Sequence, residues 1–183
     1  MMKNTIRQIL LEKRNALETA ELLEKSDKIK QNLFSITEYI KSKSVMFFVS
    51  FDNEVHTHDI INEALKNKIV IVPKVINHQI EPALIADFNN LIPSGKFDIL
   101  EPIEPISFNR KKIDIVIVAG IAFDRRGYRI GYGFGYYDRF LKTVPRSKKI
   151  GLAFDFQIVD NIPEQSYDIP VEVIVTDKEV IKC

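Results

Sequence analysis

The sequence predicts an α/β fold, with a largely parallel sheet covered by helices on both faces in a three-layer, Rossmann-like α/β/α arrangement. Short runs rich in β-branched residues recur along the chain, and segments with apolar residues at helical intervals alternate with several of them. Glycine and proline mark the turns between these segments. The 183 residues contain no internal repeat and no linker, so we expect a single domain over residues 1–183.

The N-terminal part is expected to be helical. In residues 3–41, apolar residues recur at intervals of three and four and pause near Glu18–Ala20, which predicts two helices. Thr19 could cap the second helix, but a capping box needs Glu or Gln three residues later, where Leu22 stands. The start of the second helix is therefore only weakly marked.

Strands and a helix alternate in the next part. The apolar run Ser44–Ser50 predicts a buried strand. Thr57 is expected to cap a helix over His58–Lys66. Lys68–Val72 predicts a second strand, which we expect Pro73 to end because proline donates no ladder hydrogen bond.

The second half of the chain begins with turns and ends with strands. The segment Asn77–Glu104 is expected to form short strands and turns because it contains Pro82, Pro93, Gly95 and Pro102. The most convincing strand is Lys112–Val118, which is rich in β-branched residues. The remaining predicted elements are a helix at Tyr136–Thr143 and strands at Lys149–Ala153 and Val171–Thr176.

Charge and composition exclude several classes of protein. The formal net charge is +1, so no overall field attracts nucleic acid or an anionic membrane, and any anion site must be local. Apolar runs such as Ile113–Ala119 have the length of strands, and the N-terminus has none long enough for a secretory signal. Cys183, the single cysteine, excludes an intrachain disulfide. We expect a cytoplasmic protein with no nucleic-acid or membrane partner.

The most informative segment is Ala122–Asp138, AFDRRGYRIGYGFGYYD, in which Gly131, Gly133 and Gly135 alternate. Glycine allows positive φ angles and a close approach of the backbone to a ligand. A helix that begins near Tyr136 would direct free N–H groups towards an anion. Four arginines that would strengthen such a site lie close by in sequence: Arg125, Arg126, Arg129 and Arg139.

Two common phosphate motifs are excluded, and a plain turn is an alternative. The chain has no Gly-x-x-x-x-Gly-Lys-Ser/Thr string. A dinucleotide fingerprint needs a further glycine or alanine, but Tyr136 and Asp138 occupy the positions concerned. It also needs a strand directly before the glycines, whereas a polar, arginine-rich stretch separates Val118 from Gly131. Taken alone, the glycines could form a turn without a ligand.

With its neighbours, the string DRRGYRIGYGFGYYDRFL closely resembles the signature of the 5-formyltetrahydrofolate cyclo-ligase family, also called 5,10-methenyltetrahydrofolate synthetases. Only this string is highly specific, but three further stretches resemble the family in the expected order, so that the likeness spans essentially the whole chain. These stretches are Lys3-x-x-x-Arg7 followed by Arg14, FVSFDNEVHT from Phe48, and DIPVEVIVT from Asp168. The fold that the resemblance implies is shared with sugar-phosphate isomerases and coenzyme A transferases.

The resemblance implies an ATP-dependent ligase that acts on 5-formyltetrahydrofolate, with or without a polyglutamate tail. The implied products are 5,10-methenyltetrahydrofolate, ADP and phosphate, and Mg²⁺ is the implied cofactor. ATP would phosphorylate the formyl oxygen, and N10 of the folate would then attack the formyl carbon. The task of the protein would be positioning and charge neutralisation. We expect a monomer whose partners are this folate and ATP.

The resemblance also implies residue roles by motif position. Arg129 and Tyr137 are implied in catalysis, and Asp138 and Asp168 are implied as ligands of Mg²⁺, which prefers oxygen. ATP binding is implied for Lys3, Arg7, Arg129, Ile130, Gly131, Tyr132, Gly133, Phe134, Gly135, Tyr136 and Tyr137. Substrate binding is implied for Val49, Glu54, Tyr132, Gly133, Phe134 and Gly135.

Without the resemblance, simpler interpretations hold for several of these residues. Lys3 and Arg7 would be an exposed helix face, and Glu54 would be a solvated loop acid. Asp138 would be an acid favoured in the first turn of a helix, and Asp168 a turn residue.

Phe134 departs from the family pattern, because many relatives carry lysine or glycine at this position. Lysine would be a phosphate ligand, whereas phenylalanine cannot donate to phosphate. Either Arg129 and Lys3 supply the missing charge, or Phe134 turns away or contacts the pterin. Two other functions are therefore kept as alternatives: an ATP-independent enzyme of the shared fold, and a protein that binds folate without turnover.

Overall fold

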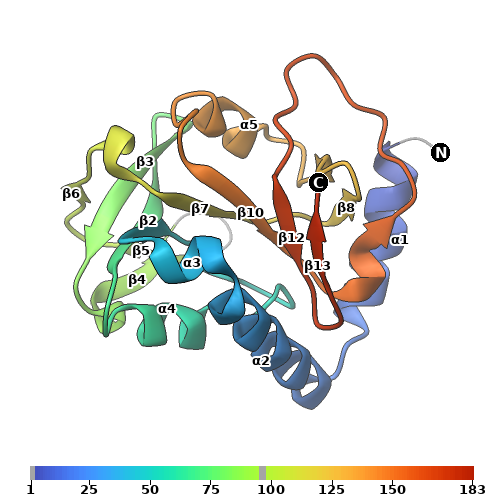
Figure 1. Cartoon of the computed structure of the whole chain (residues 1–183), viewed down its shortest axis with the longest axis horizontal. Coiled ribbons are helices and arrows are strands. Elements are labelled where there is room, and N and C mark those ends of the chain that lie inside the picture. The colour runs from blue at the N-terminus through green and yellow to red at the C-terminus, as the bar shows by residue number, and fades with distance from the viewer. Residues whose placement is uncertain (1–2, 95–97) are drawn as a thin grey trace.

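The computed structural model describes residues 3–94 and 98–183, and its main feature is a large sheet (Figure 1). The strands of this sheet are β1 (Ser44–Met46), β2 (Ile69–Ile76), β3 (Gln79–Ile85), β6 (Ile106–Ser107), β7 (Ile115–Val118), β10 (Lys148–Leu152), β12 (Val173–Val175) and β13 (Val180–Lys182). Their order is β13-β12-β10-β7-β1-β2-β3-β6. The strands from β12 to β2 run parallel, and antiparallel strands extend both edges. The predicted α/β fold with a large, mostly parallel sheet is confirmed.

Helices lie on both sides of this sheet (Figure 1). The helices are α1 (Lys3–Asn15), α2 (Thr19–Ser35), α3 (Thr37–Lys41), α4 (His58–Ala64) and α5 (Tyr136–Leu141), with 3-10 helices at Phe88–Asn90, Arg110–Lys112 and Asp155–Gln157. Residues of α2, α3 and α4 share one core cluster with the sheet, and residues of α5 share another. None of the helices in the described residues is long and apolar enough to cross a membrane.

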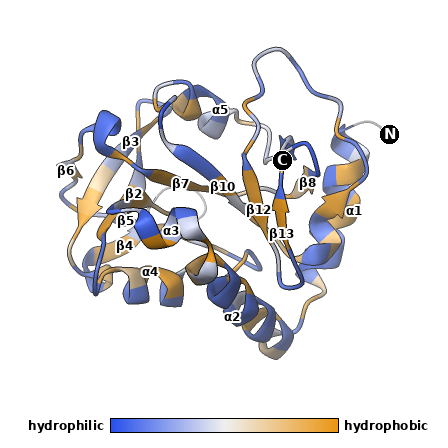
Figure 2. Ribbon diagram, in the orientation of Figure 1, coloured by the Kyte–Doolittle hydropathy of each residue, from blue (hydrophilic) through white to orange (hydrophobic). Residues whose placement is uncertain are grey.

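The core follows the two-residue period of the strands. In β7, Ile115 packs in the same cluster as Leu33 of α2, whereas the next residue, Val116, packs in the same cluster as Leu141 of α5. Figure 2 shows the result as apolar strands in the middle of the molecule and helices of mixed hydropathy around them. The β-branched runs of the sequence are therefore explained by strands buried on both faces.

A smaller sheet with the order β11-β8-β9 carries the glycine segment and was not predicted. Its strands are β8 (Ala122–Asp124), β9 (Arg129–Ile130) and β11 (Ile158–Val159). Helix α1 packs on this sheet through Ile6 and Leu10, which share a cluster with Ala122 and Ile130. The interpretation of the arginine-rich stretch as free of strands was wrong. Strand β9 leads directly into Gly131, so the exclusion of a dinucleotide fingerprint rests on the missing glycine alone.

Of the two helices predicted in the N-terminal part, the first is confirmed as α1, whereas the second divides into α2 and α3 at Ile36. This residue is extended, with φ −77° and ψ 140°, and packs partly buried against the core, so the apolar spacing continues although the helix stops. Glu18, not Thr19, occupies the cap position of α2 and makes no side-chain cap hydrogen bond. Thr57 does occupy the cap position of α4, but its side chain makes no cap hydrogen bond there either.

Strand β2 continues through Pro73, so the expected stop at this residue was wrong. The parallel pairing with β1 ends at Ile71, and on the other side Pro73 lies opposite Pro82 of β3. The carbonyl of Pro82 accepts from the Phe108 N–H on the outer side of β3, so the two prolines face each other at a pair without ladder hydrogen bonds. The N–H that proline lacks is not needed at this position.

Several other expected elements occur with shorter bounds. The run Ser44–Ser50 stays buried beyond β1, which ends at Met46, because burial does not require strand pairing. The run Lys112–Val118 forms a strand only from Ile115, and Lys112 and Asp114 before it are exposed. The expected strands and turns after Asn77 include β3 and the hairpin of β4 (Leu91–Ser94) and β5 (Ile99–Pro102). Gly95, named above as a turn signal, lies outside the described residues.

Candidate active site

The candidate site lies where three neighbouring parallel strands end. Chain segments that leave the carboxyl ends of β1, β7 and β10 line a cavity of about 10 Å³, close to the space that one water molecule needs. In open α/β sheets, ligands bind at this edge. We call this region the Glu54 pocket, and its lining residues are Arg14, Phe48, Glu54, Val55, Ala119, Gly120, Leu152 and Gln157.

The glycine segment, residues 131–135, connects β9 to α5. Gly133 has φ 101° and Gly135 has φ 66°, which are left-handed values that side chains rarely adopt. Gly131 has no neighbouring atom within 4 Å of an added Cβ, so the segment is open on that side. The expected need for positive φ is confirmed at two of the three glycines. Helix α5 begins at Tyr136, as predicted, and is six residues long.

Helix α1 directs its basic residues towards the glycine segment. The Arg7 Nε donates to the carbonyl oxygen of Gly131 at 2.9 Å. The Lys3 Nζ donates to Asp168 Oδ2 at 2.7 Å. The simple interpretation of Lys3 and Arg7 as a solvated helix face was therefore wrong, because both hold other parts of the chain.

Arg129 is buried and pairs with Asp138, one of the two predicted metal-binding carboxylates. Its side chain is only 5% exposed, and its Nη2 donates to Asp138 Oδ1 at 2.8 Å. Its Nη1 donates to the carbonyl of Ile169 at 2.6 Å, and the Ile169 N–H donates to the same Asp138 oxygen at 3.1 Å. Burial lowers the pKa of Arg129, while the negative charges of Asp138 and Asp168 oppose that shift. Asp138 thus pairs directly with the buried arginine, whereas Asp168 acts on it only through its charge.

These two carboxylates fit a magnesium ion, although both already have cationic partners. In the described residues, no group of three or more His, Cys, Asp or Glu side chains is arranged to hold a metal. Magnesium bound with a nucleotide commonly takes only one or two carboxylates and completes its shell with water and phosphate oxygens. Asp138 and Asp168 supply the carboxylate oxygens that such an ion prefers.

The loop from Phe48 to Thr57 is held in place by hydrogen bonds between its ends. The Thr57 hydroxyl donates to the Phe48 carbonyl at 2.9 Å and accepts from the Ser50 N–H at 2.9 Å. The Ser50 hydroxyl accepts from the Thr57 N–H at 3.0 Å. Thr57, read from the sequence as a helix cap, therefore fixes the loop that carries Glu54.

Glu54 is buried, so its interpretation as a solvated loop acid was wrong. Its side chain is 6% exposed, and one of its oxygens lies 4.0 Å from Arg14 Nη1. Burial raises the pKa of Glu54 to about 7, although Arg14 opposes this rise. The other oxygen accepts from the Phe51 N–H at 3.3 Å. The carboxyl group is thus poised to change its charge near neutral pH.

Two tyrosines, Tyr132 of the glycine segment and Tyr137 of α5, interact electrostatically with this carboxyl group. The Tyr132 hydroxyl accepts from Arg14 Nη2 at 2.6 Å, and the Tyr132 ring lies 5.4 Å from that of Phe51. Burial, with Glu54 as the second cause, raises the pKa of Tyr132 to about 12. The Tyr137 hydroxyl is buried and has no hydrogen-bond partner in the described residues, and burial also raises its pKa. Tyr132 is where the glycine segment and the Glu54 pocket meet.

The other predicted site residues are divided between core and surface. Val49 and Ile130 are 3% and 1% exposed, so their side chains are packed and only their backbones are open to a ligand role. Phe134 is 57% exposed and its ring centroid lies 6.0 Å from that of Tyr136. Phe134 is therefore mostly exposed, and its role among the alternatives that the sequence left open stays a prediction.

Arg14 is the residue that the site assignment from the sequence missed. It is 2% exposed and reaches both Glu54 and Tyr132, and its Nε has no partner in the described residues. The sequence did contain a signal that Arg14 is buried, because Arg14 follows Ile6 and Leu10 at four-residue intervals on the buried face of α1. A charged residue on an apolar stripe needs a partner, and here the partner lies in the pocket.

Comparison with known proteins agrees with the motifs. The model of the 5-formyltetrahydrofolate cyclo-ligase family matches residues 1–177. A 5-formyltetrahydrofolate cyclo-ligase of Mycoplasma pneumoniae is 30% identical over 97% of this chain and 100% of its own length.

Two solved structures are also similar. A 5,10-methenyltetrahydrofolate synthetase of Aquifex aeolicus has a TM-score of 0.89 and 38% identity, covering 100% of this chain and 93% of its own. A 5,10-methenyltetrahydrofolate synthetase structure from Mycoplasma pneumoniae has a TM-score of 0.79 and 30% identity, covering 97% of this chain and 99% of its own. Fold and sequence similarity therefore extend over the same, nearly complete length.

Proposed function

The chain belongs to the 5-formyltetrahydrofolate cyclo-ligase family, and we propose that its glycine segment binds ATP while the pterin of the folate binds with one edge at Glu54. It is an enzyme of this type, which carries out the ATP-dependent conversion of 5-formyltetrahydrofolate to 5,10-methenyltetrahydrofolate. The observation that carries the assignment of the two sites is their junction at Tyr132. One residue of the glycine segment there shares Arg14 with the buried Glu54.

On the nucleotide side, the proposal rests on cations and on open backbone. Arg7 of α1 contacts the glycine segment, and Gly131 leaves room there for a phosphate oxygen. Lys3 and the buried Arg129 hold Asp168 and Asp138. Because each of these cations has a protein partner, phosphate binding would replace part of those contacts. The backbone of residues 130–137, which include the glycine segment, would also contact the nucleotide, in line with the roles that the motif implies.

For magnesium, we propose Asp138 and Asp168 as the protein ligands, directly or through water. The ion would supply charge neutralisation for the phosphates of ATP. Before it binds, Arg129 pairs with Asp138 and Lys3 pairs with Asp168. Binding of the ion would therefore replace part of these contacts.

On the folate side, Glu54 is proposed to accept two N–H groups of the amino-pyrimidine edge of the pterin. The formyl oxygen of the bound folate would attack the γ-phosphorus of ATP, and ADP would leave. N10 would then attack the formyl carbon and lose its proton, and the phosphate would leave with the former formyl oxygen. The protein residues would orient the two substrates and exclude water, and Arg129 and Tyr137 are the residues proposed to take part in catalysis.

We further propose that residues 1–183 form one domain with the three-layer, Rossmann-like α/β/α arrangement expected from the sequence. The positions of α2, α3 and α4 on one face and α5 on the other support this proposal. The monomeric state and the cytoplasmic location remain predictions. Size-exclusion chromatography with light scattering tests the first of them.

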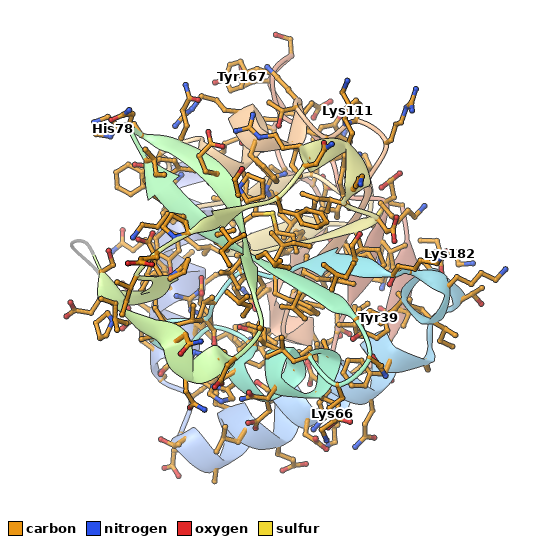
Figure 3. The ribbon with its side chains drawn as sticks, turned by 90° about the vertical axis from the view of Figure 1, so that its left-hand side faces the viewer. Tyr39, Lys66, His78, Lys111, Tyr167 and Lys182 are labelled. Carbon is orange, nitrogen blue, oxygen red and sulfur yellow. The ribbon has the colours of Figure 1, made fainter. Side chains whose placement is uncertain are left out.

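The test of the proposed function is a direct assay. Protein, Mg²⁺, ATP and 5-formyltetrahydrofolate are mixed, and the absorbance of the methenyl product is followed. We expect a signal that needs both ATP and Mg²⁺ and that is lost in Asp138→Asn. The control is Lys66→Met, which removes a charge from an exposed side chain that pairs only with Glu63 among the ion pairs of the described residues (Figure 3). Absence of an ATP-dependent signal at high enzyme concentration contradicts the proposal.

A further inference from the structure

We propose that Arg14 is a positioning residue of the folate pocket: its guanidinium fixes the Glu54 carboxyl group and the Tyr132 hydroxyl relative to each other and so links the pocket to the glycine segment. This inference rests on the proposed function, because it gives Glu54 a ligand. Arg14 has no place among the residues that the family motif implies for ATP, folate or metal.

Arg14 is a buried side chain with two partners, not a solvated surface charge. Its side chain is 2% exposed, although it belongs to a helix whose other basic residue in the last turn, Lys13, is exposed. Nη2 donates to the Tyr132 hydroxyl at 2.6 Å, and Nη1 lies 4.0 Å from Glu54 Oε1. A guanidinium can serve two partners in fixed directions, which an ammonium cannot do.

The neighbouring loop is also tied to this point of α1. Asn53 Nδ2 donates to the carbonyl of Arg14 at 3.3 Å and to that of Asn15 at 3.3 Å. The residue before Glu54 is therefore fixed to the end of α1 through its side chain, while Glu54 itself faces the guanidinium. A shift of Arg14 would move the loop and the carboxyl group together.

The same helix fixes the glycine segment at a second point. Arg7 holds the carbonyl of Gly131, and Arg14, two helical turns later, holds the hydroxyl of the next residue, Tyr132. The proposed nucleotide segment and the proposed folate pocket are therefore positioned by one rigid helix. Loss of Arg14 would release only the folate end of this arrangement.

Charge gives Arg14 a second effect on the pocket. The groups that face the Glu54 carboxyl group are Arg14 of α1, the Phe51 N–H and Asp52 of its own loop, Tyr132 of the glycine segment and Tyr137 of α5. Arg14 is the strongest of these in favouring the carboxylate, whereas burial and Asp52 favour the neutral acid. Without Arg14 the pKa of Glu54 rises further, and the acid is neutral over more of the physiological range.

A neutral Glu54 would bind the pterin differently from a carboxylate. A carboxylate accepts hydrogen bonds at both oxygens, whereas the neutral acid has one oxygen that donates. Two N–H groups of an amino-pyrimidine edge therefore need the ionised form. The unpartnered Nε of Arg14 is a further donor that a bound ligand or water can satisfy.

The test compares Arg14→Gln and Arg14→Lys with Lys13→Gln, which removes one exposed charge from the same helical turn. In Arg14→Gln at pH 7.5, we expect the KM for the folate to rise about ten-fold or more, as the loss of a charge-assisted contact predicts. The KM for ATP should change less than about three-fold, which corresponds to less than half of that energy. The acid limb of kcat/KM for the folate should move to higher pH.

In Arg14→Lys the charge remains but the second partner is lost. We expect its pH limb to stay near that of the wild type while its folate KM rises several-fold. Lys13→Gln should match the wild type in all three quantities. If Arg14→Gln is folded and keeps the wild-type folate KM and pH limb, the proposal is overturned. If Arg14→Gln does not fold, a wild-type folate KM in folded Arg14→Lys overturns it.

A binding measurement separates this inference from the proposed function. Calorimetry of 5-formyltetrahydrofolate with the wild type and Arg14→Gln needs no turnover. A wild type that binds the folate without turnover contradicts the cyclo-ligase proposal but still tests Arg14. A wild type that turns over, together with an Arg14→Gln variant of unchanged folate affinity, contradicts the inference alone.

Discussion

The two halves of the proposed site differ in how their buried polar groups are satisfied. On the nucleotide side, Lys3, Arg7 and Arg129 each hold a carboxylate or a carbonyl oxygen at 2.6–2.9 Å. On the folate side, the Nε of Arg14 and the hydroxyl of Tyr137 are buried without a partner in the described residues. The folate side also holds a carboxyl group, Glu54, whose pKa is raised to about 7.

This difference indicates what each ligand has to do on binding. A nucleotide and its metal must exchange partners, because the cations and carboxylates that would hold them are already paired. A folate must add partners, because the pocket has donors and an acceptor that are incompletely used. Substitutions on the nucleotide side should therefore cost stability as well as activity, whereas those on the folate side should separate the two.

The largest effect is expected for Arg129→Met. This change leaves Asp138 and the Ile169 carbonyl without their buried cation, so we expect a loss of about 3 kcal/mol in the free energy of unfolding. Activity should fall on the order of 100-fold, since preorganised charge is lost at the proposed phosphate site. Urea unfolding and the methenyl assay measure the two quantities.

Arg125→Met is the matched control, because Arg125 is 62% exposed and pairs with Glu179 on the surface. It should change stability by less than about 1 kcal/mol and leave activity unchanged. If Arg129→Met is as stable as this control, ion pairs do not stabilise the nucleotide side. The proposed difference between the nucleotide side and the folate side would then be wrong.

The next effect concerns Glu54→Gln and has opposite signs for stability and activity. Between the ordinary pKa of 4.5 and about 7, folded Glu54 keeps a proton that the unfolded chain has released. The free energy of unfolding therefore falls as pH rises through this window and gains nothing above it. Glutamine removes this cost, so the variant should be more stable than the wild type by up to about 3 kcal/mol at pH 8.

At pH 4 the two proteins should be nearly equal in stability, because the acid is then protonated in both states. The folate KM of Glu54→Gln should rise by about ten-fold or more, since one acceptor oxygen becomes a donor. Thermal unfolding at several pH values and steady-state kinetics measure these outcomes. A stability difference that does not depend on pH would mean that Glu54 is not the buried titrating group described here.

The fold was predictable where local patterns agree with burial. The β-branched run that forms β7 is buried on both faces, as its continuous apolar sequence predicts. Strand β8 was missed because it ends in Asp124, a polar residue that suggests a loop. Asp124 is fully buried and accepts hydrogen bonds from the N–H groups of Arg126, Tyr128 and Ile162. A buried aspartate that organises a turn is not visible in hydrophobic patterning.

The sequence predicted the position of the glycine segment, but it did not predict which charged side chains of the site are buried. The string around Gly131 identified the segment, but no local pattern showed that Glu54 is buried or that Arg14 reaches it. Both facts depend on α1 packing against the small sheet, a contact between residues more than 100 positions apart. Long-range packing of this kind is what a single sequence does not encode in its local spacing.

A smaller effect is expected for Lys3→Met on the nucleotide side. Lys3 and Asp168 are 28% and 13% exposed, so the ion pair is partly screened and its loss should cost about 1 kcal/mol or less. The KM for ATP should nevertheless rise by about ten-fold, because a charge that would face phosphate is gone. Kinetics at constant Mg²⁺ measure this, and Lys66→Met serves again as the exposed control. An unchanged KM for ATP would remove Lys3 from the nucleotide side.

The smallest effect is expected for Phe134→Lys, which places the lysine found in many relatives on the glycine segment. Phe134 is 57% exposed and its carbonyl is held by Arg139 at 2.8 Å, so the backbone contact does not depend on the side chain. Stability should change by less than about 0.5 kcal/mol. The KM for ATP should fall by about two- to five-fold at low salt and less at high salt.

Ile40→Lys, which adds the same charge at a residue 62% exposed on α3, is the control. Because every cation on the nucleotide side is already paired, a free lysine there should strengthen ATP binding without any exchange of partners. An unchanged KM for ATP in Phe134→Lys would mean that this position does not face the phosphates.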